Sequence, residues 1–444
     1  MKLKFISFQL LLLLSLSFYI TMSTSNLGHL PAEIISSILQ HISDQDDLFS
    51  CSVVNRCFYK QTLPFLWRRF TEGIHFDVEE GGQEEERMAP QSVDSLMQQQ
   101  LPHPMVKYVQ EVELCSRWTE TQLMQLMSRI GPQLEKVTMF SGRLVSDTCL
   151  QALAYYWPRL TQLELHYHNV TPDFMMAIAQ HCPQLRDLYF FGCPRLSPNI
   201  FAPLVETGIR DGHAPPLEKL KIRPWDDNIP WTYQTVLDLS QFAHLTSFSI
   251  NALAEFMYDL ITTIAVMEAW PHLTHLELTC VNTTARDDDE DDDLLIPFIQ
   301  THRQLRHVYL QGFKLTNATL EAMATYLPDL TYLGLRFISL VTVRGVRRLV
   351  RDAWCLERMD LPYCSIYYYE FPEAVYIPDD DNDNENVSHL DQEGMDQIRR
   401  IGPQGICDDD NDDDDDADDD EDKAWLRQWQ RSFVNLRLYG SGVA

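Results

Sequence analysis

The sequence predicts an α/β fold built from many copies of one short strand followed by one helix. An apolar hexad of the form Leu-x-x-Leu-x-Leu begins at Leu160, and a second copy begins 25 residues later at Leu185. Between the two copies, Phe174 and Ile178 belong to an apolar face at helical spacing that ends before Pro183. Each copy therefore predicts a strand and a helix, and repeated copies predict a stacked array.

The hexad occurs eleven times, usually 25 to 28 residues apart. The copies begin at Val109, Leu134, Leu160, Leu185, Leu217, Leu245, Leu273, Leu305, Leu330, Leu356 and Phe433. This period is that of leucine-rich repeats. Several copies continue to an apolar or cysteine position three residues after the hexad, at Cys193, Phe313, Ile338 and Cys364. The units resemble cysteine-containing leucine-rich repeats, and the resemblance implies a horseshoe-shaped solenoid over residues 106–378.

The net charge of −30 is concentrated in three tracts. Residues 287–293, 379–385 and 408–422 hold 25 of the 65 acidic residues, which leaves 40 acids against 35 bases elsewhere. Such self-repelling segments predict a solvated insert at 287–293 and a disordered acidic insert at 379–422. Docking of a basic partner on these tracts is a second possibility. Nucleic acid is excluded as a partner because this charge repels phosphate.

Residues 1–21 have the basic start and apolar run of a secretory signal. The run is shorter than a membrane-spanning helix, so membrane insertion is not expected. Met22 follows directly and is a candidate for the true start of the protein. Four glycosylation sequons would suit secretion, whereas ten cysteines without a dense framework suit a reducing compartment. The sequons lie at Asn169, Asn282, Asn317 and Asn386.

Residues 27–70 predict three short helices. The first carries a wide apolar stripe formed by Ile34, Ile38 and Ile42. Asp46 or Asp47 is expected to cap the second helix, and Pro64 to end the third. Three helices in about 40 residues are near the lower limit for burying a core unaided. Part of this surface is therefore predicted to bind a partner.

This segment resembles the F-box, which docks substrate receptors onto the Skp adaptor of cullin-RING ubiquitin ligases. Its only departure is Phe58, where many members carry Trp. The resemblance implies an adaptor-binding set made of Leu30, Pro31, Glu33, Ile34, Ile38, Leu39, Ile42, Leu48, Val54, Phe58, Leu66 and Trp67. An F-box ahead of leucine-rich repeats is itself a family architecture. A plain helical cap on the repeats is the alternative for this segment.

The remaining segments connect or close the array. Residues 71–104 are rich in Glu, Gln and Pro and predict a linker between the helices and the repeats. Residues 423–444 predict a terminal repeat, in which Trp425 and Trp429 would cover the open end.

No catalytic motif is found in the chain, so it is predicted not to be an enzyme and to need no cofactor. His166 and His168 lack further metal ligands nearby and are interpreted as surface or groove residues. Cys51 and Cys57 are interpreted as core residues, since nothing near them would lower a thiol pKa.

Binding is expected on the outward positions of the strands, where alternate side chains point away from the core. Aromatic residues and Arg dominate many protein interfaces. The predicted client-binding set is Tyr189, Phe191, Lys221, Arg223, Trp225, Tyr309 and Arg336. An acidic or phosphorylated client segment would suit this set, and a merely solvated face is the alternative.

The F-box resemblance implies the substrate-recognition subunit of a ubiquitin ligase, in the cytoplasm or nucleus, with the Skp adaptor, the cullin-RING core and an unknown client as partners. Two alternatives remain open: a secreted or lumenal repeat protein, and an F-box scaffold that works outside ubiquitination.

Overall fold

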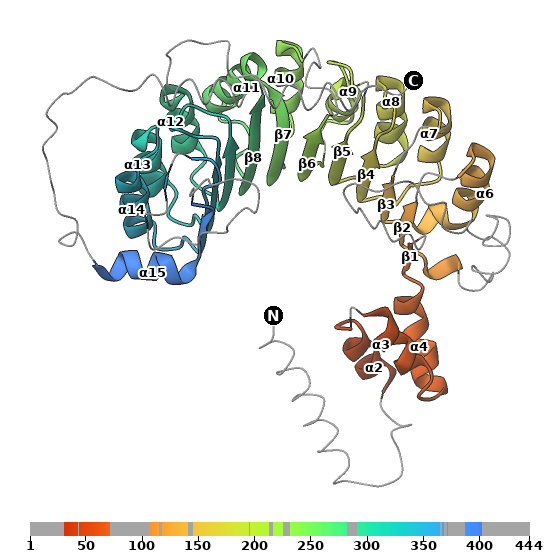
Figure 1. The fold of residues 1–444 in the computed structure, drawn as a ribbon. Helices are drawn as coiled ribbons and strands as arrows, with labels where there is room; N and C mark the ends of the chain where they lie inside the picture. Colours follow the sequence, from red (N-terminus) through yellow and green to blue (C-terminus); the bar gives the residue numbers. More distant parts are fainter. Residues whose placement is uncertain are drawn as a thin grey trace, which may run out of the picture. The chain divides into compact units, whose positions relative to one another are not determined.

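The computed structural model describes residues 31–42, 44–71, 106–114, 118–140, 145–194, 196–212, 216–224, 231–281, 291–364, 366–367, 371 and 387–401. Three helices lead into a 12-stranded sheet whose strands follow one another in chain order. Figure 1 shows the repeat strands on the inner side of an arc and the helices on its outer side. This arrangement confirms the predicted leucine-rich-repeat solenoid.

The N-terminal helices are α2 (Ala32–Leu39), α3 (Gln45–Ser52) and α4 (Arg56–Leu66). Asp44 caps α3, because its carboxylate accepts hydrogen bonds from the backbone N–H groups of Asp46 and Asp47. The prediction that Asp46 or Asp47 is the cap was therefore wrong, since both lie in the first turn. Asn55 caps α4 in the same way.

Pro64 lies inside α4 and does not end it, contrary to prediction. A proline removes only its own N–H donor, and the next turn can still close. Here the N–H of Trp67 donates to the carbonyl of Leu63 at 3.1 Å. The helix therefore ends only at Leu66.

The repeat strands pair in parallel and in register from one hexad to the next. They are β2 (Glu111–Leu114), β3 (Lys136–Met139), β4 (Gln162–His166), β5 (Asp187–Phe191), β6 (Lys219–Arg223), β7 (Ser247–Leu253), β8 (His275–Val281), β9 (His307–Gln311), β10 (Tyr332–Arg336) and β11 (Arg358–Asp360). Ten of the predicted hexads thus form strands. The eleventh, at Phe433, lies outside the described residues.

Each repeat helix returns the chain along the outer side of the sheet. The α-helices are α6 (Glu120–Ile130), α7 (Asp147–Ala154), α8 (Pro172–His181), α9 (Ala202–Asp211), α10 (Tyr233–Ser240), α11 (Ala254–Met267), α12 (Asp292–Thr301), α13 (Asn317–Tyr326) and α14 (Val343–Asp352). Short 3-10 turns occur at η2 (Val106–Tyr108) and η3 (Gly131–Gln133). Side-chain N-caps stabilise the first turns of several helices, for example Thr119 at α6 and Thr171 at α8.

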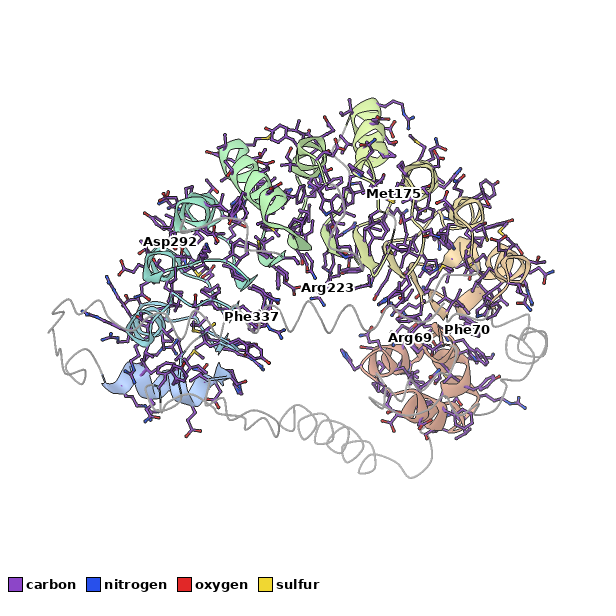
Figure 2. All side chains as sticks on the ribbon, turned by 45° about the horizontal axis from the view of Figure 1, so that its top comes forward. Arg69, Phe70, Met175, Arg223, Asp292 and Phe337 are labelled. Atoms are coloured by element: carbon purple, nitrogen blue, oxygen red, sulfur yellow. The ribbon has the colours of Figure 1, made fainter. Side chains whose placement is uncertain are left out.

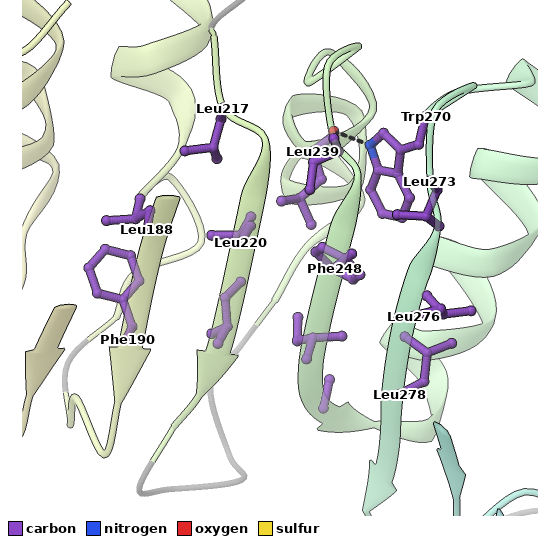
Figure 3. Packing of buried hydrophobic residues seen from close by; sticks show 14 of the residues in the cluster. Leu188, Phe190, Leu217, Leu220, Leu239, Phe248, Trp270, Leu273, Leu276 and Leu278 are labelled. Atoms are coloured by element: carbon purple, nitrogen blue, oxygen red, sulfur yellow. Dashed lines mark hydrogen bonds between the residues drawn. The ribbon is translucent and has the colours of Figure 1, made fainter. Parts of the chain in front are cut away.

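The core is one continuous layer between strands and helices. Figure 3 shows Leu188 and Phe190 of one repeat beside Leu220 of the next, and the indole of Trp270 donating to the carbonyl of Leu239 at 2.9 Å. In Figure 2, Met175 lies on the helix side of the sheet. The side chains of the hexad leucines are buried, so each repeat completes its core only against its neighbours.

The position three residues after each hexad is also internal. Cys193, Phe313, Ile338 and Cys364 are all buried there. The thiol of Cys193 donates to the carbonyl of Leu165 at 3.5 Å, and that of Cys364 to the carbonyl of Leu335 at 3.2 Å. A cysteine at this position therefore donates to a carbonyl of the preceding repeat.

Two acidic segments are more ordered than predicted. Asp291 and Asp292, expected in the solvated insert 287–293, are buried at the start of α12. Their carboxylates accept hydrogen bonds from Lys314 N–H at 2.7 Å and from Thr316 N–H at 3.1 Å. The carboxylate of Asp292 also accepts from the Thr319 hydroxyl. These partners belong to the next repeat, so the acids serve packing rather than solvation.

The predicted disordered insert 379–422 contains β12 (His389–Leu390) and α15 (Gln392–Ile401). Strand β12 pairs antiparallel with β11 and covers that edge of the sheet. Leu390 and Met395 are fully buried against the last repeat. The guanidinium of Arg399 donates to the carbonyls of Val350, Ala353 and Leu356 at 2.9 to 3.1 Å. This segment therefore covers the last described repeat. The same role was predicted for 423–444, which lie outside the described residues.

Several predicted segments lie outside the described residues: 1–21, 423–444 and, apart from Thr71, the linker 71–104. Within the described ranges, no helix combines the length and the apolar character needed to cross a bilayer.

Candidate protein-interaction surfaces

The N-terminal helices share a very small core. Ile35, Leu39 and Leu48 are the buried apolar residues at its centre. Around them pack the partly buried side chains of Ile42, Cys51, Cys57, Phe58, Phe65 and Leu66. Such a core is small for an independent domain, as the sequence indicated.

Five large apolar side chains of the helices and of the turn between α3 and α4 are exposed, and we call them the N-terminal apolar surface: Ile34, Phe49, Val53, Val54 and Tyr59. Val53 is 71% exposed and Phe49 is 60% exposed. Val53 is the C-cap of α3, four positions after Phe49, so the two side chains lie close together at the C-terminal end of this helix. Exposed apolar side chains gathered in one small domain are typical of a surface that binds another protein.

The predicted adaptor-binding residues divide between this surface and the interior. Pro31, Glu33, Ile34 and Val54 are exposed, whereas Ile38, Ile42, Phe58, Leu66 and Trp67 are partly buried. Leu39 and Leu48 are buried in the small core, so they support the surface and cannot form it. Leu30 lies outside the described residues. Phe49, Val53 and Tyr59 are also exposed but were not in the predicted set, and their immediate neighbours Leu48, Val54 and Phe58 are apolar, so local sequence did not signal their exposure.

The N-terminal helices connect to the repeat sheet without a long linker. Only Trp67 and Arg68 separate α4 from β1 (Arg69–Thr71), which pairs in parallel with β2. The carbonyl of Arg68 accepts from the N–H groups of Gln110 and Glu111 at 2.8 and 2.9 Å. Glu111 also forms ion pairs with Arg68 and Arg69, and Figure 2 shows Arg69 and Phe70 at this junction. The predicted linker 71–104 therefore follows the first strand instead of preceding the sheet.

The inner face of the sheet carries an aromatic column over β3 to β5. His166 lies between Phe140 and Phe191, with ring centroids 4.4 and 4.7 Å away. Tyr189 stacks at 6.5 Å from Phe191. Burial, followed by the charge and hydrogen bond of Asp187, raises the pKa of Tyr189, so this hydroxyl stays protonated. Tyr189 and Phe191 thus share one surface as predicted.

Lys221 and Arg223 do not present free positive charge beside this column. Both reach the carboxylate of Glu277 two strands away, at 3.0 and 3.2 Å, and Ser249 donates to the same oxygen at 2.9 Å. Burial alone would raise the pKa of Glu277, but the hydrogen bonds and charges of Lys221, Ser249 and Arg223 lower it overall. The basic cluster is therefore already partnered. In Figure 2 Arg223 projects from the inner side, and Trp225 lies outside the described residues.

The strands carry a third outward row of side chains on the inner face, beyond the two outward positions predicted for each hexad. In this row His275, His307 and Tyr332 stack, with centroids 5.5 and 4.1 Å apart. The Tyr332 hydroxyl donates to Asp360 at 2.7 Å, and Arg358 pairs with the same carboxylate at 2.9 Å. Burial lowers the pKa of both histidines, so both are neutral at pH 7. Aromatic residues recurring one position before the second hexad leucine were the available signal.

Two cysteines of the repeat core are held as protonated thiols. Burial raises the pKa of Cys149 to about 11 and that of Cys182 to about 12, which keeps both thiols protonated. His166 hydrogen-bonds Glu164 at 2.8 Å on the inner face. His168 was predicted to lie at the surface but is buried, because its ring follows the chain into the core after β4. Across the described ranges, no three His, Cys, Asp or Glu side chains converge as metal ligands.

The parallel sheet, hexad core and outer helices define a leucine-rich-repeat protein with a separate helical domain at its N-terminal end. That domain is F-box-like, because residues 27–72 match the F-box-like family model.

Solved structures of low sequence identity resemble the chain. A chain in the crystal structure of the yeast Rad7 and Elc1 complex is 17% identical, with a TM-score of 0.43 over 56% of this chain and 60% of that one. This protein thus spans three fifths of that chain's length. The leucine-rich-repeat protein LegL7 from Legionella pneumophila is 13% identical, with a TM-score of 0.38 over 67% of this chain and 89% of LegL7. No curated protein matches closely enough to count as a relative.

Proposed function

We propose that the chain is the substrate-recognition subunit of a Skp–cullin–F-box ubiquitin ligase. The F-box-like helices would dock the Skp adaptor, and the inner face of the repeats would hold a client protein for ubiquitination. The chain itself would make no covalent bond. Its contribution would be to raise the local concentration of client lysines near the conjugating enzyme.

The observation that carries this proposal is the N-terminal apolar surface on a domain matching the F-box-like model. Burying a half-exposed Val, Ile or Phe side chain contributes roughly 1 kcal/mol, so five such residues supply several kcal/mol of binding free energy. The junction through β1 supports the proposal further. A two-residue connection and a shared sheet would transmit the position of the adaptor to the client end.

Adaptor capture by a Val53→Asp variant tests the proposal. A carboxylate at this 71% exposed position would be buried without a partner in the complex. We expect capture of the Skp adaptor from cell extract to fall at least tenfold. The matched control is Val266→Asp, because Val266 is 79% exposed on the last turn of α11, far along the repeats. Equal capture by wild-type protein and both variants would contradict the proposed docking surface.

The contacts of Asn317, one of the four sequon residues, argue against the secreted alternative. The amide nitrogen of Asn317 donates to the Thr342 hydroxyl at 2.9 Å, and its oxygen accepts from Thr342 N–H at 3.1 Å. Thr342 in turn caps α14. A glycan on this nitrogen would crowd that contact.

A non-ligase scaffold would bind the adaptor but recruit no cullin, so probing the captured material for cullin separates the two F-box roles.

A further inference from the structure

The cations on the inner face between β6 and β11 are nearly all neutralised by neighbours. Lys219 pairs with Asp187 at 2.9 Å, and Arg358 pairs with Asp360 at 2.9 Å. Lys221 and Arg223 share Glu277, as described above. Arg336, at the end of β10, has no carboxylate within 4 Å among the described residues, and its Nε is buried without an acceptor.

Aromatic rings hold the Arg336 guanidinium in place. It lies 5.0 Å from the ring centroid of Phe337 and 5.4 Å from that of Tyr363, and these two rings stack 4.8 Å apart. Cation–π contact of this kind orients the planar group without satisfying its N–H donors. Figure 2 shows Phe337 on the inner side of the repeats. The cation is therefore positioned, yet its hydrogen-bonding capacity at Nε is unused.

The two rings occupy a backbone conformation that favours glycine. Phe337 and Tyr363 have φ of 55° and 61°, and both lie two residues after the last hexad leucine. Gly192 and Gly312 occupy the same repeat position, with φ of 59° and 77°. A non-glycine residue in this left-handed region costs about 1 kcal/mol. Tyr167 adopts the same conformation at this repeat position, with φ of 61°, so the turn is shared by several repeats. Aromatic residues at two successive turns place both rings beside the Arg336 guanidinium.

The neighbouring repeat extends this surface. A Cβ on Gly334 would lie 2.4 Å from Cδ2 of Tyr309, so the glycine lets the Tyr309 ring lie across β10. The Tyr309 hydroxyl donates to Gln311 at 3.0 Å, and Gln311 is in register with Arg336. A ligand that reaches Arg336 would therefore meet aromatic surface on both adjacent strands.

We propose that Arg336 binds the carboxylate of an acidic side chain in the client protein, flanked by apolar client residues that rest on Tyr309, Phe337 and Tyr363. This inference rests on the proposed function and names the chemistry of the client. One guanidinium matches one negative charge. A phosphate would bring about two charges, and the neighbouring cations Lys221, Arg223 and Arg358 are already paired with Glu277 and Asp360.

Peptide selection on the full-length protein tests this inference. A phage-displayed library of random 12-residue peptides would be selected on immobilised wild-type protein, and enriched peptides would be synthesised with each acidic residue as Glu or as Gln. We expect enrichment of Asp or Glu beside an aromatic or aliphatic residue. The Glu→Gln peptide should bind wild-type protein roughly 10-fold to 100-fold more weakly, since hydrogen bonds to charged groups are the strong ones. In Arg336→Gln protein the same peptide change should have almost no effect.

Arg223→Gln provides the matched control, because Arg223 is an inner-face cation already paired with Glu277. In this variant the peptide should keep its full dependence on Glu. Three outcomes would overturn the inference: no enrichment of acidic residues, an equal Glu→Gln loss in wild-type and Arg336→Gln protein, or tighter binding of a phosphoserine peptide. Adaptor capture by Arg336→Gln protein should match wild type, so failure at this site is distinguishable from failure of adaptor docking.

Discussion

The buried His168 is expected to make the stability of the repeats sensitive to acid. His168 is 1% exposed, and its Nδ1–H donates to the carbonyl of His166 at 2.8 Å, while Nε2 has no hydrogen-bond partner. Burial lowers the pKa of His168 to about 4, against a usual value near 6.5. Between these pH values the unfolded chain binds more protons at this site than the folded one. Stability therefore falls as the pH is lowered through this window.

Because of the lowered pKa of His168, we expect the free energy of unfolding to fall by on the order of 3 kcal/mol when the pH is lowered from 7 to 4. A His168→Gln variant keeps a donor toward the His166 carbonyl but does not titrate. Its urea midpoint, followed by circular dichroism, should fall less on acidification than that of wild-type protein. Parallel losses in the two proteins would show that His168 is not the group responsible.

Gly192 lies directly against the ring of Tyr167, in a backbone conformation that favours glycine. A Cβ on Gly192 would lie 2.4 Å from Cε1 of Tyr167, at a φ of 59°. Gly192→Ala should therefore lower the unfolding free energy by about 1–3 kcal/mol through strain and overpacking. In a Tyr167→Ala background the steric part disappears and the loss should shrink toward about 1 kcal/mol. Identical losses in both backgrounds, measured by urea unfolding, would contradict this contact.

The start of helix α12 is stabilised by buried aspartates, although the acidic composition of this tract predicted a solvated segment. Asp292 is 6% exposed and accepts from Thr316 and Thr319 of the next repeat. Asp292→Asn should cost about 1.5–3 kcal/mol of unfolding free energy, because it weakens charge-assisted hydrogen bonds in a buried site. Asp293→Asn is the control, since Asp293 lies at the same helix start but is exposed.

The Asp293→Asn variant should unfold within about 0.5 kcal/mol of wild type. Equal urea midpoints for the two variants would mean that the Asp292 contacts contribute little to folding. A larger loss of stability in Asp293→Asn than in Asp292→Asn would mean that negative charge at the helix start, and not hydrogen bonding to the next repeat, stabilises α12.

For the whole molecule, the periodic hexad was sufficient to predict the solenoid and the strand of every described repeat. A leucine at fixed spacing reports burial directly, because each strand contributes the same positions to one core. The order and function of the acidic segments were not predictable in this way. Asp292 accepts hydrogen bonds from Thr316 and Thr319, and Arg399 donates to carbonyls at and after the C-terminal end of α14. Such contacts depend on the fold rather than on local composition.

The candidate sites were predicted in part. The F-box pattern located the N-terminal domain, but a motif does not separate core positions such as Leu39 from surface positions such as Val53. Client-binding residues were chosen by outward strand position and by residue type. Neither could reveal that Glu277 neutralises Arg223 while Arg336 lacks an acidic partner among the described residues.

On our proposal, the F-box-like helices complete the burial of their apolar side chains on the Skp adaptor. Isothermal titration of the purified chain with purified Skp adaptor, at several temperatures, measures this burial. We expect a 1:1 complex with Kd below about 1 μM and a negative heat-capacity change, which is the signature of apolar burial. Absence of binding at adaptor concentrations of tens of micromolar, or binding without a negative heat-capacity change, would contradict the claim.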